Sequence, residues 1–552
     1  MDATSSSDAA ASSVSPAITR AQRSHRLSAL LLGATLLTAA CAATDTLVIA
    51  DRSDQIRDAA VIPEPPDSVE STDPPVDPET PTTAGEPSRN EPINPVDPML
   101  EPGSAPEAPE IDPAMIDRDA VDFGDDKPPQ PWDEFVLVAL ADVEGWLIEE
   151  FPAAFGMEFE PLQGGVFAAF PERTAPIPGC GTPSSSFEDI QRGGAIYCFL
   201  GDFIAYDDTP QGVVGNLASQ FGPVTFGIVM AHEYGHAIQD RTDVLRRSDL
   251  LTVDLEQQAD CVAGAWAGRA AAGQAPGVPF DDADVRAGLI SMISIQDPVG
   301  TVPTVAGGHG SGFDRVGAFQ VGFNDGLARC QQLIDDPLPL TPIALTPQDA
   351  QTGGDAPFGF DAENDLFAFL TPDLNLFYGS DLSAQFPRFT DLTLVPVQSE
   401  AEVVCNSPTG FFDIGMELCT ESNTVFLNEP VARQLYDDFG DFGPAYLLGL
   451  AWAEHAQNTN NSVLSGEPRQ LQNDCLSGAW VSTVIPDINT GQLPEPRDVG
   501  RTAVVSANDL TEAVLTAIVV GDPSFDTNVL GSAFEKIDQF RRGTLGGIDA
   551  CG

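Results

Sequence analysis

An internal repeat constrains the fold of this chain more than any other feature of its sequence. Asp260-Cys261-Val262-Ala263-Gly264-Ala265-Trp266 returns as Asp474-Cys475-Leu476-Ser477-Gly478-Ala479-Trp480. Further matches recur at one constant offset: Gly310-Ser311, Phe313, Phe319 and Cys330 return as Gly531-Ser532, Phe534, Phe540 and Cys551. The repeat predicts two folded blocks that build similar sets of elements.

The chain has 552 residues, more than one hydrophobic core usually organises. We expect two folded blocks of the α+β class, residues 132–334 and 357–552, each mainly helical with a small β-sheet. A stretch rich in Pro and Thr, in which the periodic apolar pattern lapses, predicts a linker at 335–356. We expect a disordered, extended linker at 42–131. From Ile62 onward this segment consists mostly of Pro, acidic residues, Ser and Thr.

Residues 1–41 predict an export signal. Three arginines precede the apolar run Leu27 to Leu37, which leads into Thr38-Ala39-Ala40-Cys41. The run is shorter than the roughly 20 residues of a membrane-spanning helix, so we expect it to be cleaved. Its end resembles a bacterial lipoprotein signal, in which Cys41 would be lipidated, although Thr38 stands where such signals usually carry Leu. We expect an exported cell-envelope lipoprotein, with free secretion as the alternative.

The charge balance limits the partners that this chain can have. Its 83 acidic and 25 basic residues give a formal net charge of -58. Such an excess argues against a nucleic acid partner, and it repels anionic lipid headgroups. Contact with a membrane is therefore expected only through the signal or a lipid anchor. We interpret the acidic surplus as a solvated surface rather than a cation-binding device, and the oligomeric state is not indicated.

The cysteines other than Cys41 fall at matching places in the two blocks. They are Cys180, Cys198, Cys261 and Cys330, then Cys405, Cys419, Cys475 and Cys551. An even set in an exported chain indicates disulfides. The spacing of Cys180 and Cys198 is typical of a hairpin, and the other two flank helical segments. We therefore predict the pairs 180–198, 261–330, 405–419 and 475–551; cysteine-bound metal is the alternative, which the wide spacing disfavours.

His232, Glu233 and His236 form an HExxH motif. It lies in 226–239, an apolar and almost uncharged stretch that predicts a buried helix. Residues four apart share a helix face, so His232 and His236 could bind one zinc ion, with Glu233 as general base on water. Gly235 inside a helix is unfavourable by about 1 kcal/mol relative to Ala, which predicts another segment packed closely against it.

A catalytic zinc usually has three protein ligands, so a further ligand is needed. Residues 251–269 have helical spacing, with Glu256 and Asp260 one turn apart on one face. We predict Glu256 as the third ligand of one zinc ion per chain. Asp260 is predicted to accept a hydrogen bond from the outer nitrogen of a ligand histidine. The alternative is that the two histidines lie on an ordinary helix face without a metal.

The stretches 229–239 (VMAHEYGHAIQ) and 256–266 (EQQADCVAGAW) resemble the bacterial neutral zinc metallopeptidases. Further landmarks of the resemblance are Trp146, Tyr197-Cys198, Tyr206-Asp207 and His309-Gly310-Ser311. The resemblance covers about residues 132–330. It implies a gluzincin-like fold with the ligands and the base named above, and it implies no substrate beyond a peptide or protein.

The C-terminal block lacks the predicted ligands. At the offset of the repeat, Ala453 and Gln457 stand where the two histidines stand, and Gln470 replaces the third ligand. Alanine and a neutral amide cannot bind zinc as the first set would, so we predict a degenerate copy of the metallopeptidase domain. Leu530 stands at the place of His309. This makes His309 a candidate catalytic residue that stabilises an oxyanion, with helix capping or a substrate gate as alternatives.

We therefore predict an exported zinc metallopeptidase that hydrolyses a peptide or protein substrate by Glu233-assisted attack of water. In this interpretation the second block is a pseudoenzyme domain. The alternative is a non-catalytic binding or scaffolding protein of the cell envelope, in which a zinc ion is structural.

Overall fold

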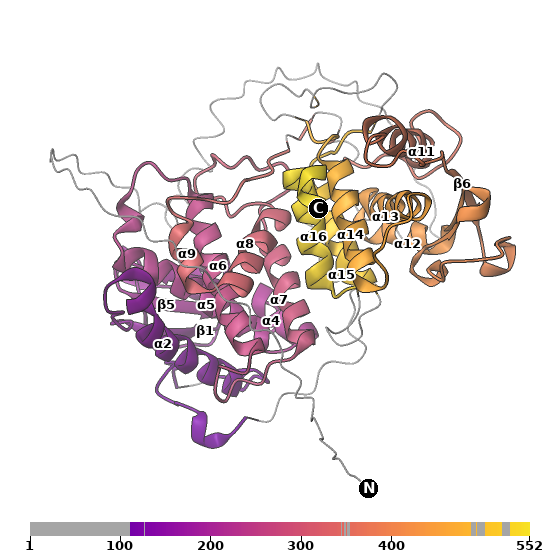
Figure 1. Cartoon of the computed structure of the whole chain (residues 1–552). Coiled ribbons are helices and arrows are strands. Elements are labelled where there is room, and N and C mark those ends of the chain that lie inside the picture. Colours follow the sequence, from indigo (N-terminus) through magenta and orange to yellow (C-terminus); the bar gives the residue numbers. More distant parts are fainter. Residues whose placement is uncertain are drawn as a thin grey trace, which may run out of the picture. The chain divides into compact units, whose positions relative to one another are not determined.

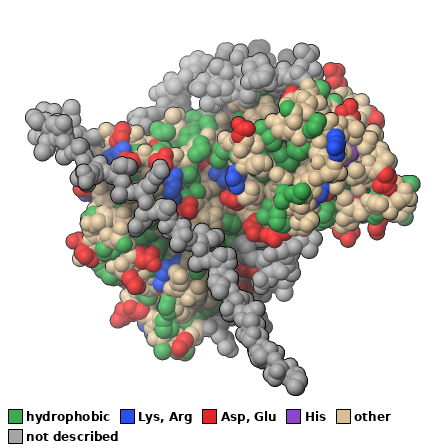
Figure 2. Space-filling model, viewed as in Figure 1, with side chains coloured by type: hydrophobic (Ala, Val, Ile, Leu, Met, Phe, Trp, Pro, Cys, Tyr) green, Lys and Arg blue, Asp and Glu red, His purple; other side chains and the backbone are tan. Residues whose placement is uncertain are grey.

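The computed structural model describes most of the chain after residue 110. The described residues are 111–125, 127–343, 345–346, 349, 354–486, 493, 503–521 and 530–552. The predicted export signal with Cys41, and the part of the predicted linker at 42–110, lie outside the described residues. None of the described helices is long and apolar enough to cross a membrane. Figure 2 shows acidic side chains distributed over the visible face instead of gathered in one patch.

The first block contains a three-stranded sheet with mixed strand directions (Figure 1). The central strand β5 (Phe203–Asp207) pairs in parallel with β1 (Gly165–Ala169) and antiparallel with β4 (Ala195–Cys198). All residues of β5 are buried, because helices cover the sheet. A short hairpin of β2 (Ile177–Pro178) and β3 (Ser184–Ser185) precedes β4.

Most of the first block is helical, which confirms the predicted α+β class. The helices predicted at 226–239 and 251–269 are present as α5 (Val224–Arg241) and α6 (Thr252–Ala271). The other helices are α2 (Asp133–Phe155), α3 (Phe187–Gln191), α4 (Val213–Phe221), α7 (Asp282–Ser294), α8 (Gly312–Asp325) and α9 (Leu327–Gln332). Among these, α6 makes close contact with both α5 and α8.

The helix α5 runs through the core of the first block. Every residue from Val224 to Gly235 is buried, and Phe226 stacks on Trp132 with ring centroids 5.1 Å apart. A Cβ added at Gly235 would lie 2.6 Å from the Cα atom of Ala259 on α6. The sequence prediction that another segment packs closely against Gly235 is therefore confirmed. This close approach brings the facing side chains of the two helices within contact distance.

The second block has a sheet with the same arrangement of strands. Its central strand β8 (Thr424–Asn428) pairs in parallel with β6 (Thr393–Val397) and antiparallel with β7 (Met416–Cys419). The helices are α11 (Leu366–Leu376), α12 (Glu429–Phe439), α13 (Phe442–Thr459), α14 (Glu467–Val481), α15 (Asp509–Val520) and α16 (Ala533–Gly546). Here α14 packs against α13 and α16, as α6 packs against α5 and α8.

All four predicted disulfides are confirmed. Each block has a bond at the end of its antiparallel edge strand and a second bond between helical segments near its C-terminus. The pairs are Cys180–Cys198, Cys261–Cys330, Cys405–Cys419 and Cys475–Cys551. Cys261 and Cys330 lie within α6 and α9 instead of flanking helices.

The folded part begins before Trp132, where the composition of the sequence placed the end of a disordered linker. Asp122 forms a parallel bridge with Phe167, and Val121 is buried. Lys127 forms an ion pair of 2.7 Å with Asp208, a residue that directly follows β5. These contacts involve only a few residues of a Pro-rich and acidic segment. A prediction from the composition of the segment therefore did not detect them.

The predicted linker at 335–356 also contacts the folded part. The Thr341 hydroxyl donates a 2.8 Å hydrogen bond to Asp314 on α8, and Leu338 and Ile343 are partly buried against the core. The backbone N–H of Ala356 donates a 2.7 Å hydrogen bond to Asp441 in the second block. The segment therefore lies on the two blocks at these points.

Candidate metal centre

Three side chains from α5 and α6 converge at the point where the two helices cross. His232 Nε2 lies 3.3 Å from Glu256 Oε2, and His236 Nε2 lies 3.4 Å from Glu256 Oε1. One ligand atom from each residue lies within 4.8 Å of the others. The HExxH spacing places the two imidazoles on one face of α5. The sequence prediction that these three residues come together therefore agrees with the structure.

The distances in this group suit a shared cation better than direct hydrogen bonds. Charge-assisted hydrogen bonds between nitrogen and a carboxylate are usually about 2.7–2.9 Å long. Ligand atoms about 2.1 Å from a tetrahedral zinc ion lie about 3.4 Å from each other. Glu256 Oε2 is buried and has no hydrogen bond of normal geometry within the described part of the chain. The donor set thus fits a divalent metal ion.

Asp260 holds His232 in a fixed orientation, as predicted. Its Oδ1 atom lies 2.8 Å from His232 Nδ1 and 2.7 Å from a guanidinium nitrogen of Arg315. Asp260 and Arg315 are both almost completely buried. The contact to Nδ1 leaves Nε2 directed toward Glu256, which is the arrangement expected for a metal-ligating histidine.

His236 has a supporting residue that the sequence interpretation missed. Its Nδ1 atom lies 3.0 Å from Gln239 Oε1, and the Gln239 amide donates a 2.7 Å hydrogen bond to the carbonyl of Leu255 on α6. Gln239 therefore orients an imidazole and joins α5 to α6. The i to i+3 spacing of His236 and Gln239 on one helix was the available signal.

The charge distribution at the site favours a positive charge between the three residues. Burial opposes protonation of His232, but the hydrogen bond with Asp260 and the nearby Glu256 outweigh it and raise the pKa to about 10. For Glu256, burial alone would raise the pKa, but the Coulombic effects of His236 and His309 hold it well below the usual value. The site therefore keeps a carboxylate ionised in a buried position.

Glu233 lies beside the two imidazoles and is not among the converging ligand atoms. Its side chain is buried, and burial raises its pKa, while His236 and His232 act in the opposite direction. A carboxylate with a raised pKa accepts a proton more readily than an exposed one. This is the property required of a general base near neutral pH.

His309 lies at the edge of the site on the loop before α8. Its side chain is 48% exposed, and its Nδ1 atom lies 3.3 Å from Asp297 Oδ1. Asp297 also accepts a 2.8 Å hydrogen bond from the backbone N–H of Gly310. The Coulombic effect of Glu256 raises the pKa of His309, which places the imidazole within electrostatic reach of the ligand group.

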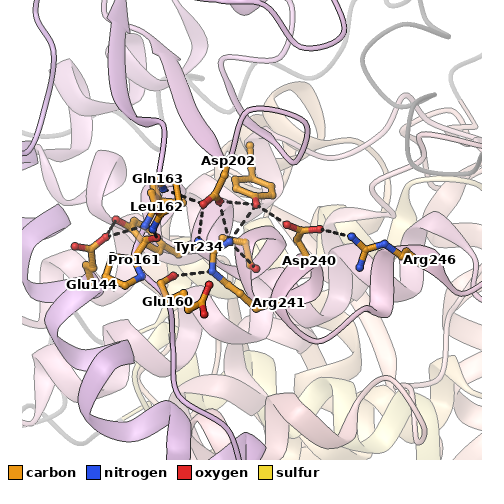
Figure 3. Close-up of polar contacts among 12 residues, drawn as sticks. Glu144, Glu160, Pro161, Leu162, Gln163, Asp202, Tyr234, Asp240, Arg241 and Arg246 are labelled. Carbon is orange, nitrogen blue, oxygen red and sulfur yellow. Dashed lines mark hydrogen bonds and ion pairs between the residues drawn. The ribbon is translucent and has the colours of Figure 1, made fainter.

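A polar network fixes the far side of α5 (Figure 3). Arg241 donates hydrogen bonds of 2.9 and 3.1 Å to the two carboxylate oxygens of Asp202, in the turn between β4 and β5. Tyr234 donates a 3.2 Å hydrogen bond to Glu144 on α2, so its ring points away from the ligands. Tyr197 on β4 donates a 2.9 Å hydrogen bond to Asp202. The network attaches α5 to the sheet and to α2 at once.

The helix pair α13 and α14 of the second block holds no comparable ligand group. Gln457 donates a 3.1 Å hydrogen bond to the carbonyl of Arg469, as Gln239 does to that of Leu255. This match places Glu454, and not Gln457, at the position of His236, one turn from the register inferred from the sequence offset. The Glu454 carboxylate accepts a 3.0 Å hydrogen bond from the guanidinium of Arg469. A cationic side chain therefore occupies this crossing.

Comparisons with known proteins give a partial likeness. No protein-family model matches the chain, and no solved structure matches it. Uncharacterised proteins of Mycobacterium bovis and of two strains of Mycobacterium tuberculosis are 33% identical to it over 169 residues, which is 27% of this chain and 55% of each relative. The chain thus spans about half the length of these curated relatives, and the likeness identifies neither a family nor an activity.

Proposed function

We propose that the first block is a gluzincin-like zinc metallopeptidase domain that cleaves peptide bonds. The main support is the convergence of His232, His236 and Glu256. The Nε2 atoms of the two histidines lie 3.3 and 3.4 Å from the carboxylate oxygens of Glu256. Two neutral imidazoles and one carboxylate are a known ligand set of catalytic zinc, which leaves a coordination position open. The zinc ion bound there would act as a Lewis acid that acidifies water and polarises a peptide carbonyl.

Glu233 would move the proton during the reaction. Its buried carboxylate takes a proton from the attacking water and returns it to the leaving amine. The raised pKa of Glu233 supports this role, because the proton must be accepted and released near neutral pH. His309 would donate a hydrogen bond to the oxyanion that develops on the substrate, since it lies within electrostatic reach of Glu256 and remains half exposed to an incoming peptide.

We further propose that residues 357–552 are a degenerate copy of the first block without a zinc site. Support comes from the shared strand order, the shared packing of the last helices and the matching disulfides. The ion pair of 2.9 Å between Asp474 and Lys536 stands where Asp260 contacts Arg315. With Leu450 and Glu454 at the positions of the two histidines, this block has no zinc ligand set.

We also propose that the protein is exported from the cytosol. Disulfides form and persist in oxidising compartments outside the cytosol, and the described residues contain four of them. We propose a cell-envelope lipoprotein attached through Cys41. Mass spectrometry of the mature N-terminus would show a diacylated cysteine, whereas an unmodified N-terminus after residue 40 or 43 would establish free secretion.

The activity is tested with purified protein and a Glu233→Gln variant. The expected result is about one bound zinc per chain in both preparations and a loss of roughly 10²–10⁴-fold in peptide cleavage by the variant. Substitution of His236 by Ala should remove both zinc and activity. If the wild type and Glu233→Gln both hold zinc and cleave every tested peptide at the same rate, or not at all, the proposal is wrong. A non-catalytic binding protein with a structural zinc then replaces it.

A further inference from the structure

Four acidic side chains gather at the start of the second block, far along the chain from the candidate zinc site. Asp355 lies at the end of the predicted linker, Asp441 precedes α13, and Asp509 and Glu512 lie on the first turn of α15. One carboxylate oxygen each from Asp355, Asp441 and Glu512 lies within 4.8 Å of the others. Three separate segments of the chain therefore direct carboxylates to one point.

Three of the four carboxylates are buried, and the side chain of Asp355 is partly exposed. Asp441, Asp509 and Glu512 are 7%, 3% and 2% exposed. The Oδ1 atom of Asp441 is buried and has no hydrogen-bond partner among the described residues, while Oδ2 accepts a 2.7 Å hydrogen bond from the Ala356 N–H. A buried carboxylate oxygen without a hydrogen-bond partner, on a side chain next to other carboxylates, is unfavourable unless a cation compensates its charge.

Among the described residues, no basic side chain forms an ion pair with Asp441, Asp509 or Glu512. Arg469 and Lys536 pair with Glu454 and Asp474 instead. Burial raises the pKa of Asp441 to about 7, and the Asp355 charge acts in the same direction. The pKa of Glu512 is also raised by burial and by the neighbouring Asp509 and Asp441 charges.

The backbone leaves room for the group. Gly440 has a φ of +111°, and a Cβ added there would lie 2.4 Å from the Glu512 carboxylate. Glu512 accepts a 3.0 Å hydrogen bond from the Phe442 N–H, and Asp509 accepts one of 2.8 Å from the Ser506 N–H. These bonds hold two carboxylates in place before any ligand arrives, as a preorganised site requires.

We propose that Asp355, Asp441 and Glu512 bind a calcium ion, with Asp509 adding negative charge beside it. Calcium takes six to eight oxygen ligands in flexible geometry and accepts several carboxylates, whereas magnesium usually keeps most of its waters and uses one or two. Carboxylates without nitrogen or sulfur donors disfavour zinc. The bound ion would join the end of the predicted linker, the start of α13 and the start of α15.

The test measures calcium binding by the full-length protein and its effect on thermal unfolding. Calcium chloride should raise the unfolding temperature by roughly 3 to 10 °C at 10 mM, given a dissociation constant of about 10⁻⁴ to 10⁻³ M. Sodium chloride of equal ionic strength and magnesium chloride are the comparison salts. An equal shift with all three salts, or no calorimetric heat with calcium, overturns the proposal.

Two variants make the test specific. Asp441→Asn should abolish the calcium shift yet leave the calcium-free protein at least as stable as the wild type, because it removes a buried, uncompensated charge. The control Asp437→Asn removes an exposed charge on the neighbouring α12 and should keep the shift. If Asp441→Asn keeps the calcium shift, the ion binds elsewhere and the proposal is wrong. Glu512→Gln provides an independent second variant with the same expectation.

Discussion

At the scale of single residues, Asp260 determines which nitrogen of His232 faces Glu256, because it contacts Nδ1 and leaves Nε2 on the side of Glu256. The carboxylate is fully buried between an imidazole and the Arg315 guanidinium. Arg315 neutralises Asp260 and fixes its position, so that the carboxylate accepts the Nδ1–H of His232 and Nε2 stays available to a metal. Residues outside the ligand set therefore control the ligand geometry.

Replacing Asp260 by Asn should weaken metal binding without removing a ligand. We expect a loss of about 10–100-fold in zinc affinity, because the amide no longer stabilises the required tautomer of His232. Competition with a chromogenic chelator measures this loss. The control Asp243→Asn changes an exposed residue in a left-handed conformation that Asn also adopts, and it should leave zinc affinity unchanged.

The sequence predicted that the three proposed ligands converge and that Asp260 contacts His232, but not the contacts of Arg315 and Gln239 that hold them. The two histidines follow a spacing that places them on one helix face. Arg315 and Gln239 act through contacts whose partners, Asp260 and Leu255, lie on another helix. Such pairings depend on the crossing of α5, α6 and α8, which residue spacing along one segment does not specify.

At the scale of elements, the crossing of α5 and α6 depends on Gly235. A Cβ at this position would meet the backbone of Ala259, which cannot move aside as a flexible side chain could. The proposed ligands His236 and Glu256 lie close to the same crossing. Any increase in the separation of the helices would therefore lengthen the distances among the ligand atoms.

Two glycine substitutions should have opposite effects on stability. Gly235→Ala should lower the free energy of unfolding by about 1–3 kcal/mol through overpacking, and it should also weaken zinc binding. Gly145→Ala on α2, where a Cβ meets nothing within 4 Å, should raise the free energy by about 0.4–1 kcal/mol. Denaturant unfolding of the two variants measures the difference. Equal effects would show that the close helix contact is not required.

The disulfide between α6 and α9 should contribute more than the one at β4. Cys261 and Cys330 are 69 positions apart, against 18 for Cys180 and Cys198, so the former restricts the unfolded chain more. Removing each pair by double substitution with Ala should lower stability by about 2–4 kcal/mol, with the 261–330 loss larger by about 1 kcal/mol. Calorimetric melting of both variants checks this order.

At the scale of the whole molecule, the sequence predicted the α+β class and the disulfides, and it misplaced the edges of the linkers. The constant offset of the repeat would place Gly443 at the position of Gly222, but Gly440 is the glycine that follows α12 with a positive φ, as Gly222 follows α4. The register of α13 therefore differs by almost one turn from the sequence offset. Insertions in loops change such offsets, and local matches between short motifs cannot locate them.

The buried carboxylates of the second block predict a pH dependence of stability. The pKa of Asp441 is raised to about 7 by burial and by Asp355, so the folded state binds more protons than the unfolded state between about pH 4 and 7. Calcium-free protein should therefore lose stability as the pH rises through this range. Asp509 and Glu512, whose pKa values are also raised, act in the same direction.

Melting temperatures from pH 4 to 8 measure this dependence with and without calcium. Saturating calcium should reverse the loss at pH 7 to 8 and have little effect at pH 4, where protons compete with the ion. The variant Asp441→Asn should flatten the calcium-free profile. A wild-type profile that rises from pH 5 to 7 without calcium would contradict the assignment of these buried acids.

The guanidinium of Arg469 beside Glu454 gives the second block a counter-ion that is part of its own polypeptide. A covalently attached cation cannot be removed by a chelator or by dilution. Under the proposed function, the crossing of α13 and α14 is therefore independent of zinc supply, while the crossing of α5 and α6 depends on it. Removal of zinc alone should loosen the α5 and α6 pair and leave the α13 and α14 pair unchanged, so the second pair can serve as an internal control in any measurement of zinc dependence.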